Sequence, residues 1–208
     1  MVRLMDMGLE KLNSLLLEMA SMSEKSVATA INAYNKGEKG TGVREAASKL
    51  RALHHQVSEL SMEIIARYQP VASDLRFIKA CLEISYGFFR YGRYARDIVE
   101  VLEMFGDLSA CDHKAVVDTA NKAQEMIRMS IDAFARRNLE LARRISQMDD
   151  EVDTRYRENV KRVLNRSTDP RCALSAALIS RYIERMADHA AYIGASVVYI
   201  VTGVEPPN

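Results

Sequence analysis

The sequence predicts an all-α protein made of two tandem antiparallel three-helix bundles, and three observations support this fold class. The 208 residues include only 4 prolines and 9 glycines, so few residues interrupt long helices. Apolar residues recur at spacings of three or four along six long segments of about 25 to 30 residues, and short connections between such helices favour antiparallel neighbours. A weak internal repeat relates the two halves of the chain.

The first half is expected to form three helices, which span residues 5–35, 43–68 and 73–105. The first carries the apolar stripe of a helix with one buried face, formed by Leu9, Leu12, Leu16, Met19, Val27, Ile31 and Tyr34. It ends at the glycine-rich connector 37–42. The second ends before Pro70, because the residue before a proline is pushed out of the α region. Ser73 and Asp74 offer an N-cap or a first-turn acid for the third.

The second half repeats this plan with helices expected over residues 112–137, 139–165 and 170–202. Asp169 and Pro170 predict the N-cap and first-turn proline of the last helix. Ile84–Ile98 can be laid on Ile179–Ile193 at a constant offset of 95 residues, which places similar residues on corresponding helices. The predicted domains are therefore a first repeat over 1–107, a second repeat over 108–203, and a tail over 204–208.

Composition excludes several classes of protein. The 29 Lys and Arg residues balance 28 Asp and Glu, and a net charge of +1 argues against direct nucleic-acid binding. The 3 cysteines are odd in number and lack a C-x-x-C pair, which predicts free buried thiols in a reducing compartment. No signal peptide is visible, and the most membrane-like stretch, 190–201, has about half the length that a bilayer requires. We therefore expect a cytoplasmic protein.

A group of acids in the second half predicts the chemistry of the protein. Glu184 and Asp188 are four residues apart, so they share one face of the last helix. On the preceding helix, Asp153 shares a face with Asp149 and with Asp150. If these two helices are antiparallel neighbours, the carboxylates meet and repel one another unless protons or a cation neutralise them. Oxygen ligands of this kind suit Mg²⁺, Mn²⁺, iron or Zn²⁺.

A second interpretation treats the same acids as ordinary surface charge. Acid pairs at this spacing are common on solvated helix faces, and Arg155, Arg157 and Arg185 are close enough in sequence to form ion pairs with them. Burial of Glu184 and Asp188 distinguishes the two interpretations, because solvated carboxylates favour the surface one.

Three segments together resemble one known family. They are Arg67-Tyr-Gln-Pro-Val-Ala-Ser-Asp-Leu-Arg76, Asp150-Glu-Val-Asp153 and Glu184-Arg-Met-Ala-Asp188-His-Ala190. They are similar to the R-x-Q-P-V-A-x-D-L-R, D-x-x-[IV]-D and E-R-x-x-D-H-A sequences of the PhoU family of phosphate-uptake regulators. The resemblance extends over nearly the whole chain and implies the same tandem three-helix plan.

The resemblance also implies a metal centre in the second repeat only. Members of the family bind multinuclear iron or zinc clusters through E-x-x-x-D carboxylates, one cluster in each repeat. Here Asp150, Asp153, Glu184 and Asp188 stand at the matching positions, and Asp149, which shares a helix face with Asp153, is a further candidate ligand; magnesium or manganese are further options for the metal. In the first repeat, Phe89 and Arg93 stand where Glu and Asp are expected, and Arg51 falls where the partner helix would supply an acid. An arginine cannot coordinate a cation, so we expect the first metal site to be lost.

The arginines of the first repeat suggest a further hypothesis. Arg51, Arg90 and Arg93 are candidates to bind an anion such as phosphate where relatives hold metal, because the guanidinium group suits oxyanions. In the alternative interpretation, Arg93 pairs with Glu63 or Asp97, or is solvated.

The function that the resemblance implies is regulation without catalysis, and no residue is assigned a catalytic role. We expect a metal-stabilised helical adaptor on a phosphate ABC transporter at the cytoplasmic face of the membrane, peripheral to the membrane through that partner. A sensor histidine kinase is the second expected partner, a homodimer is the expected assembly, and the residues that bind partners remain unassigned. Two alternatives stay open: a metal-dependent hydrolase or oxidase, and a metal-free structural dimerisation module.

Overall fold

The computed structural model of the chain is an all-α protein, as the sequence predicts. It describes residues 4–166 and 169–206, and within these residues it contains no strand. The six helices are α1 (Leu4–Lys36), α2 (Val43–Tyr68), α3 (Ala72–Phe105), α4 (Lys114–Arg136), α5 (Leu139–Arg166) and α6 (Pro170–Thr202). Each helix end lies within two residues of the end that apolar periodicity and turn residues predict.

The helix ends show where local sequence signals succeed and where one is wrong. Asp169 is the N-cap of α6, as predicted: its carboxylate accepts a hydrogen bond from the Arg171 amide at 2.8 Å. Ser73 is not the N-cap of α3, because Val71 already has the extended backbone of a cap (φ −102°, ψ 155°). Helix α3 therefore begins at Ala72, and Asp74 lies in its first turn.

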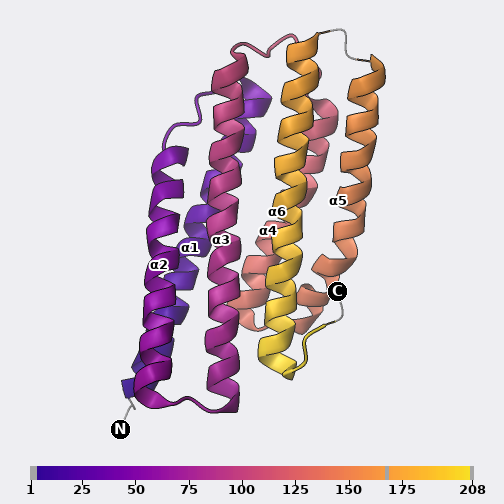
Figure 1. The fold of residues 1–208 in the computed structure, drawn as a ribbon. Helices are drawn as coiled ribbons and strands as arrows, with labels where there is room; N and C mark the ends of the chain where they lie inside the picture. Colours follow the sequence, from indigo (N-terminus) through magenta and orange to yellow (C-terminus); the bar gives the residue numbers. More distant parts are fainter. Residues whose placement is uncertain (1–3, 167–168, 207–208) are drawn as a thin grey trace.

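Helices α3 and α6 form the centre of the molecule, where they lie side by side (Figure 1). Helix α3 packs against α1 and α2 of the first repeat, and α6 packs against α4 and α5 of the second. A further contact between α1 and α4 joins the repeats on another side. Each repeat is thus a three-helix unit whose last helix also faces the other unit.

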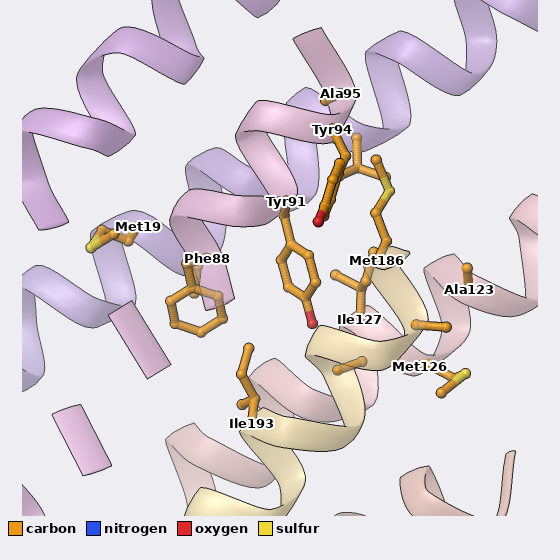
Figure 2. Close-up of a cluster of buried hydrophobic side chains, with 14 of the residues drawn as sticks. Met19, Phe88, Tyr91, Tyr94, Ala95, Ala123, Met126, Ile127, Met186 and Ile193 are labelled. Atoms are coloured by element: carbon orange, nitrogen blue, oxygen red, sulfur yellow. The ribbon is translucent and has the colours of Figure 1, made fainter. Parts of the chain in front are cut away.

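One continuous apolar core runs through both repeats. Figure 2 shows part of it: Phe88 and Tyr91 of α3 lie beside Ile193 of α6 and Ile127 of α4. Tyr91 is fully buried, and its hydroxyl lies within hydrogen-bonding distance (3.3 Å) of Ser130 Oγ on α4. The two repeats therefore share one core, and the domain boundary near residue 107 stays a prediction from the sequence.

Helix α6 contains the apolar stretch that most resembles a membrane segment, residues 190–201. Its inward side chains, such as Ile193 and Val197, are buried in the shared core. None of the helices among the described residues is both long and apolar enough to span a bilayer.

The cysteines correct one expectation. Cys111 and Cys172 form a disulfide with a Cα–Cα distance of 5.4 Å, whereas Cys81 is a free buried thiol. The prediction of free thiols is therefore wrong for two of the three cysteines. An odd number leaves one cysteine unpaired but does not prevent the other two from pairing, and residues 61 positions apart meet here because the linker 106–113 passes the first turn of α6.

Close helix packing depends on small residues in α6. A Cβ atom on Gly194 would lie 2.9 Å from the carbonyl oxygen of Ala142 on α5. Backbone cannot move as a flexible side chain can, so this position admits only glycine at the observed helix separation.

Gly194→Ala is expected to lower the free energy of unfolding by about 1 to 3 kcal/mol, despite the better helix propensity of alanine, because α5 and α6 must separate. Urea denaturation measures this. Gly8→Ala is the matched control, since its Cβ would approach only the end of the Ile64 side chain, and it should change stability by less. Equal stability of Gly194→Ala and wild type would contradict the packing argument.

Candidate metal centre

The packing of α5 against α6 brings three predicted ligands together. Asp153 of α5 and Glu184 and Asp188 of α6 each offer a carboxylate oxygen, and these oxygens lie within 4.8 Å of one another. They form the one group of three or more metal-ligating side chains found among the described residues. Spacings of four on α6 and three or four on α5 predict which residues share a face, and the helix pairing makes the two faces meet.

Glu184 is the most buried member of this acidic cluster, with 8% of its surface exposed. Its Oε1 accepts a hydrogen bond from Arg181 Nη1 at 2.5 Å. Its Oε2 is buried and has no hydrogen-bond partner in the described structure, with Arg185 Nε 3.8 Å away. A buried carboxylate oxygen without a donor is costly, which is the opposite of what a surface charge would show.

Asp188 and Asp153 are each paired with an arginine on the outer side of the cluster. Arg185 Nη1 donates to Asp188 Oδ2 at 3.1 Å, and Arg157 Nη2 donates to Asp153 Oδ2 at 3.1 Å. The predicted ion pairs therefore exist, but they engage one oxygen of each carboxylate. The ion pairs and the acidic cluster coexist, and the burial of Glu184 favours the metal interpretation over the surface one.

Asp149 and Asp150, adjacent in sequence, have different environments. Asp149 is half-buried, and its Oδ1 has no hydrogen-bond partner in the part of the chain that is described. Burial, reinforced by the charges of Asp188 and Asp153, raises the pKa of Asp149 to about 6. Asp150 is exposed and does not belong to the group of converging oxygens. Of the five predicted ligands, three converge, Asp149 interacts with them electrostatically without joining the group of converging oxygens, and Asp150 is exposed.

The cluster carries more negative charge than its surroundings neutralise. Burial raises the pKa of both Glu184 and Asp188, and mutual repulsion adds to this, although Arg181 and Arg185 oppose it. Two unpartnered buried oxygens, Glu184 Oε2 and Asp149 Oδ1, supply free lone pairs. An all-oxygen donor set of this kind fits a hard or borderline cation.

The arginines Arg181 and Arg185 are the site residues that sequence reasoning missed or undervalued. Arg181 precedes Glu184 by one helical turn, and its ion pair partly neutralises the most buried acid. The i, i+3 spacing was available as a signal, but only the structure shows that the pair is half-buried.

The corresponding region of the first repeat has different chemistry. Buried residues of α2 and α5 correspond at an offset of 95, in the pairs Leu50/Ile145, Leu53/Met148 and Val57/Val152. In this alignment of the repeats, His54 and Ser58 occupy the positions equivalent to Asp149 and Asp153. Arg51 occupies the position equivalent to Ser146. The expectation that Arg51 replaces a ligand is therefore wrong, because the helix face that Arg51 occupies is the exposed one.

His54 and Phe89 occupy the position where the second repeat has its acids. Their rings stack at a centroid distance of 5.7 Å with an interplanar angle of 8°, and His54 Nδ1 lies 2.9 Å from Ser85 Oγ. Burial, with a smaller contribution from His55, lowers the pKa of His54, which favours the neutral ring. A neutral aromatic pair thus stands where carboxylates would be needed for a cation.

The three arginines proposed as an anion site have separate environments. Arg93 pairs with Asp97 at 3.9 Å, as the alternative interpretation expects. Arg90 donates to the hydroxyls of Tyr86 and Tyr94 and lies over both rings. Arg51 is exposed. These contacts favour structural roles, and phosphate binding by these arginines remains a prediction that calorimetry would test.

Comparison with known proteins finds similarity over nearly the whole chain. The PhoU domain model matches residues 16–102 and again residues 116–197. A Pseudomonas aeruginosa protein named phosphate-specific transport system accessory protein PhoU homolog is 31% identical over 207 residues, covering 95% of this chain and 85% of that protein. A Clostridium acetobutylicum protein of the same name is 27% identical over 209 residues, covering 97% of this chain and 95% of its own length.

Solved structures show the same fold. The crystal structure of PhoU from Pseudomonas aeruginosa superposes with a TM-score of 0.87 at 30% identity, covering 96% of this chain and 99% of that one. A PhoU structure from Streptococcus pneumoniae gives a TM-score of 0.78 at 21% identity, covering 98% and 100% of the two chains, and at that identity it supports the fold alone. The six-helix arrangement is therefore shared with experimentally determined structures.

Asp149→Asn is expected to stabilise the metal-free protein at neutral pH. The folded-state pKa of about 6 lies above the usual value near 3.8, so ionisation as the pH rises through 6 lowers stability. After allowance for solvent screening of a half-buried group, the variant should gain roughly 1 kcal/mol at pH 7.5, and the gain should shrink as the pH falls from 6 towards 4.

Urea denaturation in the presence of a chelator, repeated across this pH range, measures the difference between variant and wild type. Glu158→Gln removes an exposed carboxylate of the same helix and serves as the control, with a smaller gain expected. A gain that is equal for both variants, or independent of pH, would refute the burial of charge at Asp149.

Proposed function

Since the two domain matches together span most of the sequence, the chain belongs to the PhoU family, and we propose that it regulates phosphate uptake and phosphate signalling. The names of its relatives, phosphate-specific transport system accessory proteins, supply the system on which it acts. The observation that carries the proposal is the presence of both domain copies in one chain with the family fold. The protein is a regulator and not an enzyme.

The geometry also bears on the enzymatic alternative. A metal-dependent hydrolase or oxidase needs a cavity that admits substrate to an open coordination position. A cavity of about 1020 Å³ lies between the connector 37–42 and the linker 106–113. Another, of about 440 Å³, lies along α3 and α6 beside Tyr192. The acidic cluster lines neither of them. We therefore favour a structural role for a cation between the acids of α5 and α6.

We infer that the acidic cluster holds a cation that stabilises the second repeat. Asp153, Glu184 and Asp188 would be its ligands and Asp149 a neighbouring one, whereas Asp150 has the least structural support because it is exposed. An iron or zinc cluster, or magnesium or manganese, would supply positive charge between α5 and α6. That charge would offset the repulsion among the buried carboxylates and so hold the two helices at one angle.

The proposed adaptor role needs a surface for a protein partner. The family motif 67–76 forms the turn between α2 and α3, where Tyr68, Val71 and Leu75 are exposed (37%, 72% and 44%). Apolar side chains gathered at one end of a helical bundle are typical of a docking surface. We propose that this turn contacts a phosphate ABC transporter at the cytoplasmic face of the membrane, with a sensor histidine kinase as a further partner and a homodimer as the assembly.

Binding of the proposed cation should raise thermal stability. At a free metal concentration 100 times the dissociation constant, linkage gives about 2.7 kcal/mol, or an increase of roughly 5 to 10 °C in Tm for a chain of this size. Glu184→Gln and Asp188→Asn should abolish this increase, because each removes a ligand charge without changing side-chain size. Calorimetric melting of protein dialysed against a chelator and then loaded with Fe²⁺, Zn²⁺ or Mn²⁺ measures the effect, and elemental analysis counts the bound metal.

Glu158→Gln provides the matched control, since Glu158 lies exposed on α5 and is not part of the acidic cluster. It should retain the full increase in Tm. Wild-type protein that gains no stability from any of these metals, or Glu184→Gln protein that binds as much metal as wild type, would reject the metal centre.

Val71→Asp and Leu75→Asp should weaken docking to the transporter about tenfold, because each places a charge in an apolar contact. Val71 is the N-cap of α3, where aspartate is favoured, so folding should be preserved. The measurement is recovery of transporter subunits from solubilised membranes of phosphate-replete cells, by affinity capture and mass spectrometry. Leu164→Asp, at an exposed position of α5, is the control. Unchanged recovery with both variants would place the docking surface elsewhere.

A further inference from the structure

The disulfide lies where the two repeats are joined. Cys111 belongs to the linker 106–113 between α3 and α4, and Cys172 lies in the first turn of α6. Figure 1 shows the linker at the end of the bundle where α6 begins. The bond therefore attaches the connection between repeats to the helix that carries Glu184 and Asp188.

Other contacts of the linker are not covalent. His113 Nδ1 lies 2.8 Å from the Tyr34 carbonyl oxygen of α1, and its Nε2 lies 2.8 Å from the Leu108 carbonyl oxygen. The rings of His113 and Tyr34 stack at 4.3 Å. Asp107 Oδ1 accepts a hydrogen bond from the Ser109 amide at 2.9 Å. None of these contacts reaches α6, to which the linker is attached by the disulfide and by the attraction between the charges of Asp107 and Arg171.

One half of this disulfide lies at a cavity. Cys111 borders the cavity of about 1020 Å³ that the linker forms with the connector 37–42, and both half-cystines are only partly buried. Cys81 differs in both respects: it is fully buried, and burial raises the pKa of its thiol to about 12. The molecule therefore contains a partly exposed disulfide and a fully buried third thiol.

The cavity decides which sulfur is attacked first. Cys111 borders it, whereas Cys172 lies in the first turn of α6, where the Asp169 carboxylate accepts hydrogen bonds from the Arg171 amide and guanidinium. A reagent that enters through the cavity would therefore attack Cys111 and release Cys172 as the leaving thiolate.

We propose that Cys111 and Cys172 form a reversible redox site that attaches the inter-repeat linker to α6 when oxidised and releases it when reduced. A low-molecular-weight thiolate such as glutathione bonds to Cys111 Sγ, and the electron pair of the broken bond leaves on Cys172 Sγ, which takes a proton. A second thiolate then displaces Cys111 from the mixed disulfide, and the reagent departs as its own disulfide. Oxidised glutathione reverses both steps, so two electrons and two protons are exchanged. The proposal requires neither the metal centre nor a role in phosphate uptake.

The test equilibrates the folded, full-length protein in millimolar buffers of reduced and oxidised glutathione at several ratios. Acid quenching, labelling of free thiols with a maleimide and peptide mass spectrometry then give the fraction of each cysteine that is reduced. Cys111 and Cys172 should titrate together with the ratio, whereas Cys81 should label only after unfolding. Reduction should lower Tm by roughly 10 °C, as expected for opening a loop of 61 residues. It should also speed amide exchange in residues 106–113.

Matched variants separate the possible results. Cys111→Ser should abolish the glutathione dependence of Tm and of amide exchange, and Cys81→Ser should retain both. A pair that stays reduced in oxidised glutathione, or one that glutathione reduces only after the protein unfolds, would overturn the reversible site. Reduction that leaves amide exchange in the linker unchanged would overturn its release.

Discussion

The close packing of α3 against α6 is the constraint on which the rest of the structure depends. Both helices are buried on several sides, and their approach is so close that a Cβ atom on Gly87 would lie 2.8 Å from the side chain of Ile193. The contact fixes how each helix is rotated about its axis. Rotation in turn decides which side chains face the flanking helices: Phe89 towards α2, and Glu184 and Asp188 towards α5. The packing of α3 against α6 thus determines which side chains lie at the corresponding positions of both repeats.

Local patterns in the sequence predict the helices and part of the site, whereas non-local contacts decide the rest. The spacing of Glu184 and Asp188 guarantees a shared face, because it follows from helix geometry alone. Spacing cannot choose between Asp149 and Asp150 as neighbours of Asp153, since that choice depends on the rotation of α5 against α6. The replacement of the first site by His54 and the pairing of Cys111 with Cys172 likewise depend on contacts between distant segments.

Equivalent backbone positions carry neutral rings in the first repeat and acidic side chains in the second. In the first, stacked rings of His54 and Phe89 fill the position between α2 and α3, and the lowered pKa of His54 favours a neutral group there. In the second, buried carboxylates destabilise the crossing of α5 and α6 until protons or a cation neutralise them. The cation proposed for the second repeat would therefore have no counterpart at the corresponding position of the first.

Helix α6 carries the disulfide and the acidic cluster at different points along its length. Cys172 precedes Glu184 by 12 residues, about 18 Å along an α-helix. The disulfide restrains the start of the helix through the linker, and the cation proposed for the acidic cluster would restrain its middle through α5. Neither group touches the other, so any coupling must travel through the rigid helix and its contact with α3. A helix restrained at both points is held against both repeats, and losing either restraint leaves the other to hold it.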